Sequence, residues 1–206
     1  KSNHSTSEAS TSHRILIVGG GGRENSLAWA LKRSRNTAEV FVAPGNAGTE
    51  ALQGCQAIDV QENDSLGLLK ICTEKKITLV VIGPESPLSE GMGNILREAG
   101  LAVFGPDKKG AQLEASKSWA KSLMMEAGIP TAKYWTTNNE KEALEILHDF
   151  NKPLVIKADG LAAGKGVTVP KSMQDSISAI SDSFKGKFGS AGQQIVMEEL
   201  LSGPEI

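Results

Sequence analysis

The stretch ILIVGGGGRENSLAWALKR, residues 15–33, indicates the fold class. Residues 15–18 are aliphatic, as in a short buried strand, and a run of glycines follows them directly. Residues 24–33 then bring apolar side chains to one side of a helix. A strand, a tight glycine turn and a helix in this order are typical of α/β domains, so we predict an α/β fold with a parallel sheet.

The alternation of strands and helices continues to about residue 104. Further strands are expected at residues 40–43, 79–82 and 102–104. Further helices are expected at residues 65–75 and 88–99. Right-handed crossovers between these strands would give a Rossmann-like, doubly wound domain.

The pattern is different after residue 104. Helices are expected near residues 115–127 and 140–149, and strands at residues 133–135, 153–158, 167–169 and from Ile195 onward. We therefore place a domain boundary near Glu114, between a domain at residues 14–114 and another at residues 115–206.

The opening KSNHSTSEASTSH, residues 1–13, is rich in Ser and Thr and has no large apolar residue. Such a segment cannot help to form a core, and we predict that it is disordered. A transit peptide is the alternative, but Glu8 and the absence of arginine before Arg14 argue against it. Because the chain starts at Lys1 and stops soon after a predicted strand, we expect it to be a fragment.

Composition and charge give no reason to expect a nucleic-acid or membrane partner. The 206 residues include 22 Lys and Arg against 24 Asp and Glu, so the net charge is only -2. No apolar run approaches the roughly 20 residues that span a bilayer. Cys55 and Cys72 lack metal-binding spacing and suggest reduced thiols, so we expect a cytoplasmic protein, with the plastid stroma as the alternative.

The glycine turn, GGGGRE at residues 19–24, is the first candidate binding feature. Backbone N–H groups at the start of a helix can bind phosphate. The dinucleotide fingerprint GxGxxG fails here, and no acidic residue ends the second strand, so NAD is disfavoured. A tight turn without a ligand is the alternative.

The motifs PGNAGT and GPESPL follow two other predicted strands. In open α/β sheets, ligands gather where parallel strands end. The polar side chains of Asn46, Thr49 and Glu85 could bind sugar hydroxyls or an amine there. Taken singly, each motif is also an ordinary turn.

The segment KADGLAAGKGVTV, residues 157–169, has lysines in and before a glycine-rich loop. It is not a P-loop, because Gly166 stands where the hydroxyl residue belongs and a strand follows where a helix should. A loop of this kind between two strands suggests a flap over a triphosphate. A hairpin with solvated lysines is the alternative.

The segment IVMEELLSGPE, residues 195–205, joins an apolar strand to carboxylates and leucines. Backbone groups after such a strand can meet an adenine edge, leucines can cover its face, and a later carboxylate can bind ribose. An exposed acidic strand end would have the same sequence features.

Together, GGGGRENSLAW, VAPGNAGT, VVIGPESPL, FGPDKKGAQLEASK, GIPTAKYW, VIKADGLAAGKGV and FGSAGQQIVMEELLSGPE resemble, in order and spacing, the motifs of the glycinamide ribonucleotide synthetase family. The resemblance covers residues 14–206. It implies a pre-ATP-grasp domain followed by the first part of an ATP-grasp domain, whose mobile α+β lid corresponds to the flap.

The resemblance also implies a reaction. Glycine would be activated by ATP as glycyl phosphate and captured by 5-phosphoribosylamine, with Mg²⁺ or Mn²⁺ on the phosphates. No residue of the chain is implied as a covalent catalyst or as a metal ligand. By match to the family motifs, the ATP-binding residues would be Lys117, Lys157, Gly164, Lys165, Gly166, Glu198, Glu199, Leu201 and Glu205. The phosphoribosylamine-binding residues would be Gly21, Gly22, Arg23, Asn46, Gly48 and Glu85.

The chain departs from the family pattern at Asn25, where the family usually has His. The segments that complete the nucleotide site and bind the metal would lie beyond Ile206, so we do not expect this chain to turn over alone. We expect a monomer. A sibling ATP-grasp carboxylate–amine ligase would share the lysines but not GGGGRE together with PGNAGT, whereas a non-catalytic nucleotide-binding module remains an open alternative.

Overall fold

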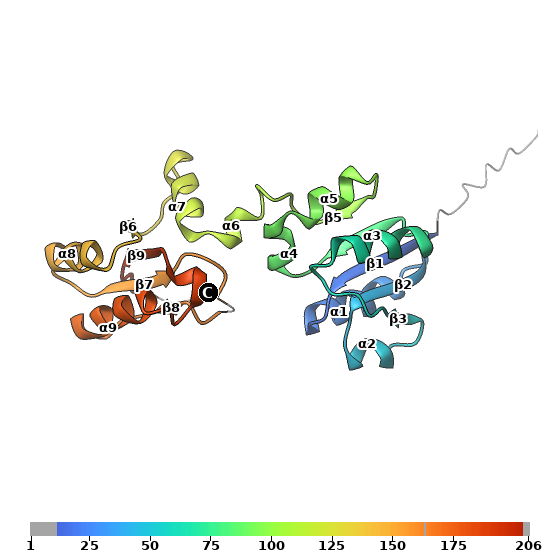
Figure 1. Cartoon of the computed structure of the whole chain (residues 1–206), viewed down its shortest axis with the longest axis horizontal. Coiled ribbons are helices and arrows are strands. Elements are labelled where there is room, and N and C mark those ends of the chain that lie inside the picture. The colour runs from blue at the N-terminus through green and yellow to red at the C-terminus, as the bar shows by residue number, and fades with distance from the viewer. Residues whose placement is uncertain (1–11, 163, 204–206) are drawn as a thin grey trace, which may run out of the picture. The chain divides into compact units, whose positions relative to one another are not determined.

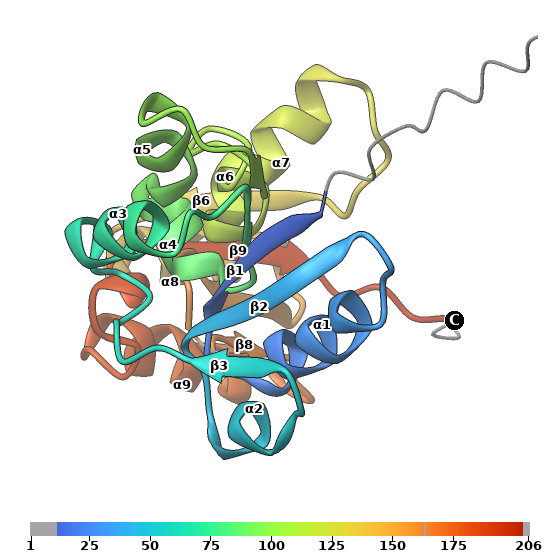
Figure 2. The same cartoon turned by 90° about the vertical axis from the view of Figure 1, so that its right-hand side faces the viewer.

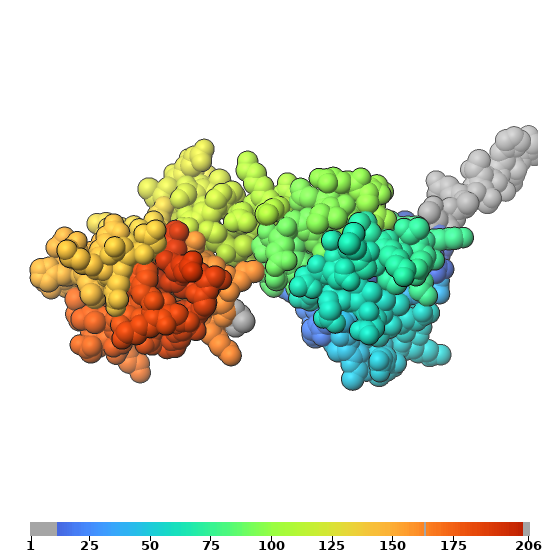
Figure 3. All heavy atoms as spheres, in the orientation of Figure 1, coloured from blue at the N-terminus to red at the C-terminus, as the bar shows by residue number. Residues whose placement is uncertain are grey.

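The computed structural model describes residues 12–162 and 164–203. The chain divides into two compact units between Ala111 and Gln112. Figures 1 and 3 show the first unit in blue to green and the second in yellow to red. Each unit has its own sheet and its own hydrophobic core.

Most of the segment predicted to be disordered, residues 1–11, lies outside the described residues. His13, which we had assigned to that segment, instead begins the first strand. Its backbone N–H donates to Asn36 O at 2.7 Å, so pairing with the neighbouring strand extends the sheet to this residue.

The sheet of the first unit is parallel, with the strand order β3-β2-β1-β4-β5. Figure 2 shows β1, β2 and β3 side by side. Strand order reverses between β1 and β4, and the loops that follow these strands border this switch point, where open sheets bind ligands. The strands are β1 (His13–Gly19), β2 (Thr37–Pro44), β3 (Cys55–Ala57), β4 (Leu79–Ile82) and β5 (Val103–Phe104).

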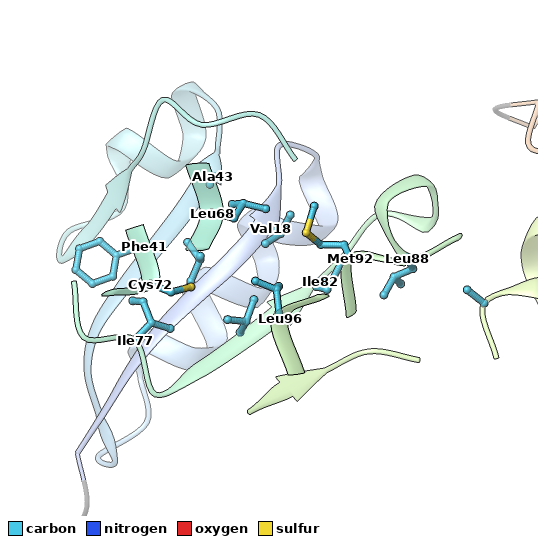
Figure 4. Close-up of a cluster of buried hydrophobic side chains, with 13 residues drawn as sticks. Val18, Phe41, Ala43, Leu68, Cys72, Ile77, Ile82, Leu88, Met92 and Leu96 are labelled. Carbon is cyan, nitrogen blue, oxygen red and sulfur yellow. The ribbon is translucent and has the colours of Figure 1, made fainter. Parts of the chain in front are cut away.

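Helices cover both faces of this sheet because its strands are apolar on both sides. Ile15 and Ile17 of β1 pack with α1 (Gly22–Lys32), while Leu16 and Val18 belong to the opposite core. Figure 4 shows that opposite core, in which Leu68, Met92 and Leu96 lie over the strands. The other helices of the unit are α2 (Ala47–Ala51), α3 (Ser65–Glu74), α4 (Glu85–Glu90) and α5 (Met92–Glu98).

The predicted helix at residues 88–99 is wrong in one respect. It is two helices, α4 and α5, because Gly91 adopts a left-handed conformation with φ of 100°. Strand β3 and helix α2 were not predicted, since both are short.

The sheet of the second unit is antiparallel, with the strand order β6-β9-β7-β8. Its strands are β6 (Tyr134–Thr137), β7 (Leu154–Ala158), β8 (Val167–Thr168) and β9 (Ile195–Glu199). Helices α8 (Glu140–Phe150) and α9 (Met173–Phe184) form one core with Ile156 and Met197. Because side chains alternate along a strand, Lys157 and Glu198 point to the other face of the sheet.

The predicted helix at residues 115–127 is also two helices, α6 (Gln112–Ala115) and α7 (Lys117–Glu126). Ser116 separates them: its backbone is extended and its side chain caps α7 by accepting from Trp119 N at 3.1 Å. Helix α9 and the short helix η1 (Gly189–Gly192) were not predicted.

The predicted fold class is confirmed, because a parallel α/β unit precedes an antiparallel sheet packed with helices. Within the described residues, no helix combines the length and apolar character needed to cross a membrane.

Candidate functional site

In the first unit, the glycine turn lies where the loops after β1, β2 and β4 meet closely. Gly19 has φ of 126°, and a Cβ there would lie 2.8 Å from Cγ of Pro84. A Cβ on Gly20 would lie 2.8 Å from Gly45 O. A Cβ on Gly22 would meet nothing within 4 Å, so the space beside this residue is open. Glycine is therefore required at 19 and 20 by packing, but not at 22.

A buried carboxylate shapes this turn. Glu24 is only 3% exposed, and its Oε2 accepts from Gly21 N at 2.8 Å. Its Oε1 accepts from Arg23 Nε at 2.9 Å. A Cβ on Gly83 would lie 2.0 Å from Glu24 Oε1, so glycine at 83 makes room for this carboxylate. Glu24 thus fixes both the turn and the direction of Arg23.

Arg23 also reaches the loop after β4. Its Nη1 donates to Glu85 Oε1 at 2.9 Å, and the two side chains are 52% and 45% exposed. The hydrogen bond from Arg23 lowers the pKa of Glu85, and hydrogen bonds to Glu85 and Glu24 raise the pKa of Arg23. The structure thus brings these two predicted residues together as an exposed ion pair.

Asn46 ties the loop after β2 to the glycine turn. Its Nδ2 donates to Gly20 O at 2.8 Å and to Gly21 O at 3.3 Å, and its Oδ1 accepts from Thr49 N. A Cβ on Gly48 would lie 2.9 Å from Asn46 Oδ1 and 3.0 Å from Asn25 Nδ2. Asn46 therefore joins the two loops through its side-chain amide, and the close packing at Gly48 leaves no space for a larger residue.

Asn25 borders this packing, since a Cβ on Gly48 would lie 3.0 Å from its Nδ2. Among the described residues, its Oδ1 is the one buried side-chain polar atom without a hydrogen-bond partner. The predicted residues of this unit lie on the turns and first helical turns that follow β1, β2 and β4: Gly21, Gly22, Arg23, Asn46, Gly48 and Glu85.

In the second unit, Glu198 joins two lysines on the sheet face opposite to α8 and α9. Its Oε1 lies 2.8 Å from Lys157 Nζ, and its Oε2 lies 3.1 Å from Lys121 Nζ. Lys157 and Glu198 are diagonal neighbours, because Lys157 pairs with Val196 and Glu198 pairs with Val155. Lys157 is 26% exposed, whereas Lys121 is only 10% exposed.

Lys117 lies one helical turn before Lys121 on α7, on the same helix face. Its Nζ donates to the backbone oxygens of Asp159 and Gly160 at 3.5 and 3.3 Å. Burial lowers the pKa of Lys117, and the charge of Asp159 partly opposes this effect. The side chain is therefore a partly desolvated cation that interacts with carbonyl groups.

The glycine-rich loop joins β7 to β8, as predicted. Gly164 has φ of 75°, and the buried Gly166 accepts from Ala158 N at 2.7 Å through its carbonyl. A Cβ on Gly166 would lie 2.7 Å from Cβ of Ala162, so glycine is needed there for packing. The side chain of Lys165 is exposed.

The remaining predicted ATP-binding residues lie at or after the end of β9. Glu199 is the last residue of β9, and its N–H donates to Lys133 O at 2.9 Å. Leu201 is 69% exposed beyond the strand. Glu205 lies outside the described residues.

Sequence reasoning gave no role to Glu24, Lys121 or Asp159, although each contacts a predicted site residue. The i, i+4 spacing of Lys117 and Lys121 was the available signal for Lys121. Across residues 12–162 and 164–203, no group of three or more His, Cys, Asp or Glu side chains could hold a metal ion.

Comparisons with known proteins identify a family for both units. The family model described as phosphoribosylglycinamide synthetase, N domain, matches residues 13–114. The model described as phosphoribosylglycinamide synthetase, ATP-grasp (A) domain, matches residues 115–206. The two models thus follow one another without a gap along this chain.

Two curated relatives match almost the whole of this chain. A phosphoribosylamine–glycine ligase from Nostoc is 48% identical over 94% of this chain and 45% of its own length. The human trifunctional purine biosynthetic protein adenosine-3 is 46% identical over 94% of this chain and 19% of its own length. The chain therefore spans less than half of the length of these relatives.

Solved structures share the fold. The phosphoribosylamine–glycine ligase of Thermotoga maritima has a TM-score of 0.69 and 34% identity, over 93% of this chain and 44% of that one. A biotin carboxylase domain of Hydrogenobacter thermophilus 2-oxoglutarate carboxylase, solved with MgADP, has a TM-score of 0.70. It is 16% identical over 92% of this chain and 44% of that one, so it shows the fold alone.

Proposed function

Because the chain belongs to the phosphoribosylglycinamide synthetase family, we propose that the protein containing it is an ATP-dependent ligase of purine biosynthesis. It joins glycine to 5-phosphoribosylamine and releases glycinamide ribonucleotide, ADP and phosphate. The observation that carries this proposal is the uninterrupted match of both family models over residues 13–206.

The second unit supplies the groups that suit ATP. Lys117 and Lys157 present ammonium groups beside the root of a glycine-rich loop, and each suits a phosphate oxygen. Lys165 and the glycines at 164 and 166 belong to the loop proposed to close over the nucleotide. The segment from Glu198 through Glu199 to Leu201 is proposed for the adenine side, and Glu205 for the ribose.

The first unit supplies the proposed site for 5-phosphoribosylamine. Gly21 and Gly22 stand at the N-terminal end of α1, where backbone N–H groups favour a phosphate. Arg23 adds a positive charge, and Asn46, Gly48 and Glu85 supply polar groups in the adjoining loops. These groups suit an anionic aminosugar better than an apolar ligand.

In the proposed reaction, the carboxylate of glycine attacks the γ-phosphate of ATP, and the amine of phosphoribosylamine then displaces phosphate from glycyl phosphate. Lysines at the phosphates act by holding geometry and offsetting negative charge, without forming covalent bonds. Magnesium or manganese, when bound, further offsets the phosphate charge.

The direct test is formation of ADP by the full-length protein supplied with ATP, fresh phosphoribosylamine and glycine. ADP formation should depend on both other substrates, and glycinamide ribonucleotide should appear in equal amount. A folded protein that binds ATP but releases no glycine-dependent ADP would instead be a nucleotide-binding module.

The role of Lys157 is testable by calorimetry with a non-hydrolysable ATP analogue. A charged hydrogen bond contributes about 1.5–3 kcal/mol, so Lys157→Met should weaken binding by about 10- to 150-fold. Lys165→Met should lower turnover more than affinity, because loop closure follows binding. Lys141→Met is the matched control, since Lys141 is an 87% exposed lysine of α8. Unchanged affinity in a folded Lys157→Met protein would refute the phosphate contact.

We also propose a cytoplasmic monomer. The free thiols of Cys55 and Cys72 suit a reducing compartment. Light scattering of the full-length protein after size-exclusion chromatography would test the oligomeric state, and a dimer mass would contradict it.

A further inference from the structure

Asp159 stands at the root of the glycine-rich loop, directly after β7, and its carboxylate faces the start of α7. Its Oδ1 accepts from Ser118 N at 2.6 Å. Its Oδ2 accepts from Ser118 Oγ at 2.9 Å and from Ser116 Oγ at 3.1 Å. Both carboxylate oxygens are therefore occupied by neutral donors of the residues that flank Lys117.

The backbone carbonyl and N–H of Asp159 also form hydrogen bonds, to α7 and to the segment before β9. Its carbonyl accepts from Lys117 N at 3.3 Å and from Lys117 Nζ at 3.5 Å. Its N–H donates to Gln194 O at 3.0 Å, just before β9. One residue thus connects the loop root, the first turn of α7 and the strand that carries Glu198.

The direction of this carboxylate matters for anion binding. A carboxylate that paired with Lys117 Nζ would offset its charge and compete with a phosphate for it. Asp159 instead directs its oxygens to hydroxyl and backbone donors, and Lys117 Nζ contacts only carbonyl groups among its described hydrogen-bond partners. Since an ammonium has three N–H donors, Lys117 retains capacity for a phosphate oxygen.

We propose that Asp159 is a positioning residue of the ligase reaction, which fixes Lys117 against the root of the glycine-rich loop. A bound triphosphate would then contact Lys117 and the loop root in a fixed arrangement. The proposal rests on the proposed function, because it requires that Lys117 and the loop bind ATP. A helix cap alone would need only one oxygen, whereas Asp159 uses both oxygens and its main chain.

Asp159 also affects the charge of Lys117. Burial lowers the pKa of Lys117; Asp159 of the loop, Glu114 of α6 and Glu198 of β9 raise it, and Lys157 of β7 lowers it. Removing the charge of Asp159 should therefore lower the pKa of Lys117 further. Binding that needs protonated Lys117 is lost when the pH rises through the pKa of Lys117. Without the charge of Asp159, this loss would occur at a lower pH than in the wild type.

The test compares Asp159→Asn with wild type in the full-length protein. With one carboxylate oxygen replaced by an amide, we expect the Kd of a non-hydrolysable ATP analogue to rise by about 10-fold or more. The alkaline loss of binding should move to lower pH. Trypsin cleavage after Lys165 should no longer be slowed by the analogue, because closure of the loop is uncoupled from Lys117.

Asp175→Asn is the matched control. Asp175 also accepts a backbone N–H at a helix start, from Lys171 at 2.8 Å, but it lies on α9. The Asp175→Asn substitution should alter the melting temperature only. If Asp159→Asn does the same, with unchanged Kd, pH profile and trypsin protection, Asp159 is a structural cap and the proposal is overturned.

Ser118→Ala keeps the test decisive if Asp159→Asn fails to fold. It removes one hydroxyl donor and leaves the 2.6 Å backbone contact, so a smaller rise in Kd, about 2- to 5-fold, is expected. An unchanged Kd would overturn the proposal. These binding measurements need no glycine, so absence of glycine-dependent turnover would refute the ligase function while leaving the Asp159 result readable.

Discussion

Replacing Lys121 by methionine tests the buried charge cluster of the second unit. Lys121 Nζ lies 3.1 Å from Glu198 Oε2, 2.6 Å from Thr131 Oγ1 and 5.5 Å from the centre of the Tyr134 ring. Methionine keeps most of the apolar stem and removes all of these polar contacts. The effect on stability should therefore come from the charge and its hydrogen bonds.

The expected loss in the free energy of unfolding depends on which partner Glu198 keeps. Breaking a buried ion pair costs about 3–5 kcal/mol when the other charge is left unpaired. Glu198 keeps Lys157 at 2.8 Å, so we expect a smaller loss, about 2–3 kcal/mol in the free energy of unfolding. For a unit of this size, that loss lowers the melting temperature by roughly 10–20 °C.

Urea unfolding followed by tryptophan fluorescence measures this loss, since Trp119 and Trp135 belong to the second unit and Trp29 to the first. Lys141→Met is the control, because its pair with Glu145 is 3.8 Å long and highly exposed. The control should change the free energy of unfolding by less than about 0.5 kcal/mol.

A loss no larger than that of the control would refute the reasoning. A double-mutant cycle with Glu198→Gln separates the ion pair from the contact with Thr131. Coupling of at least about 1 kcal/mol is expected between residues in direct contact. Additive effects would assign the cost to Thr131 and to packing instead.

Three further predictions concern the first unit. Gly83→Ala should destabilise it by about 1–3 kcal/mol in thermal unfolding, because its Cβ would lie 2.0 Å from Glu24 Oε1, whereas Gly22→Ala, with nothing within 4 Å, should be neutral or stabilising. In a carboxyl NMR titration, the pKa of Glu85 should lie below the usual range of glutamate, and Arg23→Ala should move the midpoint upward. The stabilisation from this pair is present above the unfolded-state pKa of Glu85, and it is lost as the pH falls through the folded-state pKa. Burial raises the pKa of Cys72 to about 11, so a thiol reagent at pH 8 should label Cys55 in the folded chain and Cys72 only on unfolding.

The strands at the centre of the first sheet could be predicted because they are apolar on both faces. Leu79–Ile82 has the predicted bounds, and β1 and β2 extend the predicted strands by one to three residues at an end. Strand β3 could not be predicted in the same way, since it is short and Gln56 at its centre is exposed.

Helix α9 was missed for a different reason. Its sequence, MQDSISAISDSF, is rich in serine, which favours caps and turns over helix interiors. Tertiary contacts override that preference: Ser176 is fully buried and donates to Leu154 O at 3.0 Å, and Ser183 donates to Ala179 O. A single sequence does not show which serines find such partners.

The kinds of residue in the candidate site were predictable, but their pairing was not. Lysines in and beside a glycine-rich loop suggest a phosphate ligand, because charged N–H donors bind phosphate oxygens strongly. The contact between Lys157 and Glu198, however, depends on the antiparallel register of β7 and β9, which are far apart in the sequence. The inward position of Asp159 likewise depends on how the loop root meets α7.

If Lys157 binds ATP as proposed, its pairing with Glu198 would keep the lysine ordered before ATP binds and still leave it available to a phosphate. A phosphate oxygen must compete with Glu198 for Lys157 Nζ, which alone would reduce the net gain in affinity. Leaving a nearly buried carboxylate unpaired would be costly. Lys121 removes most of that cost, because it stays on Oε2 of Glu198 when Lys157 leaves Oε1. Under the proposed ATP role, the buried Lys121 thus allows Lys157 to move from the carboxylate of Glu198 to a phosphate oxygen.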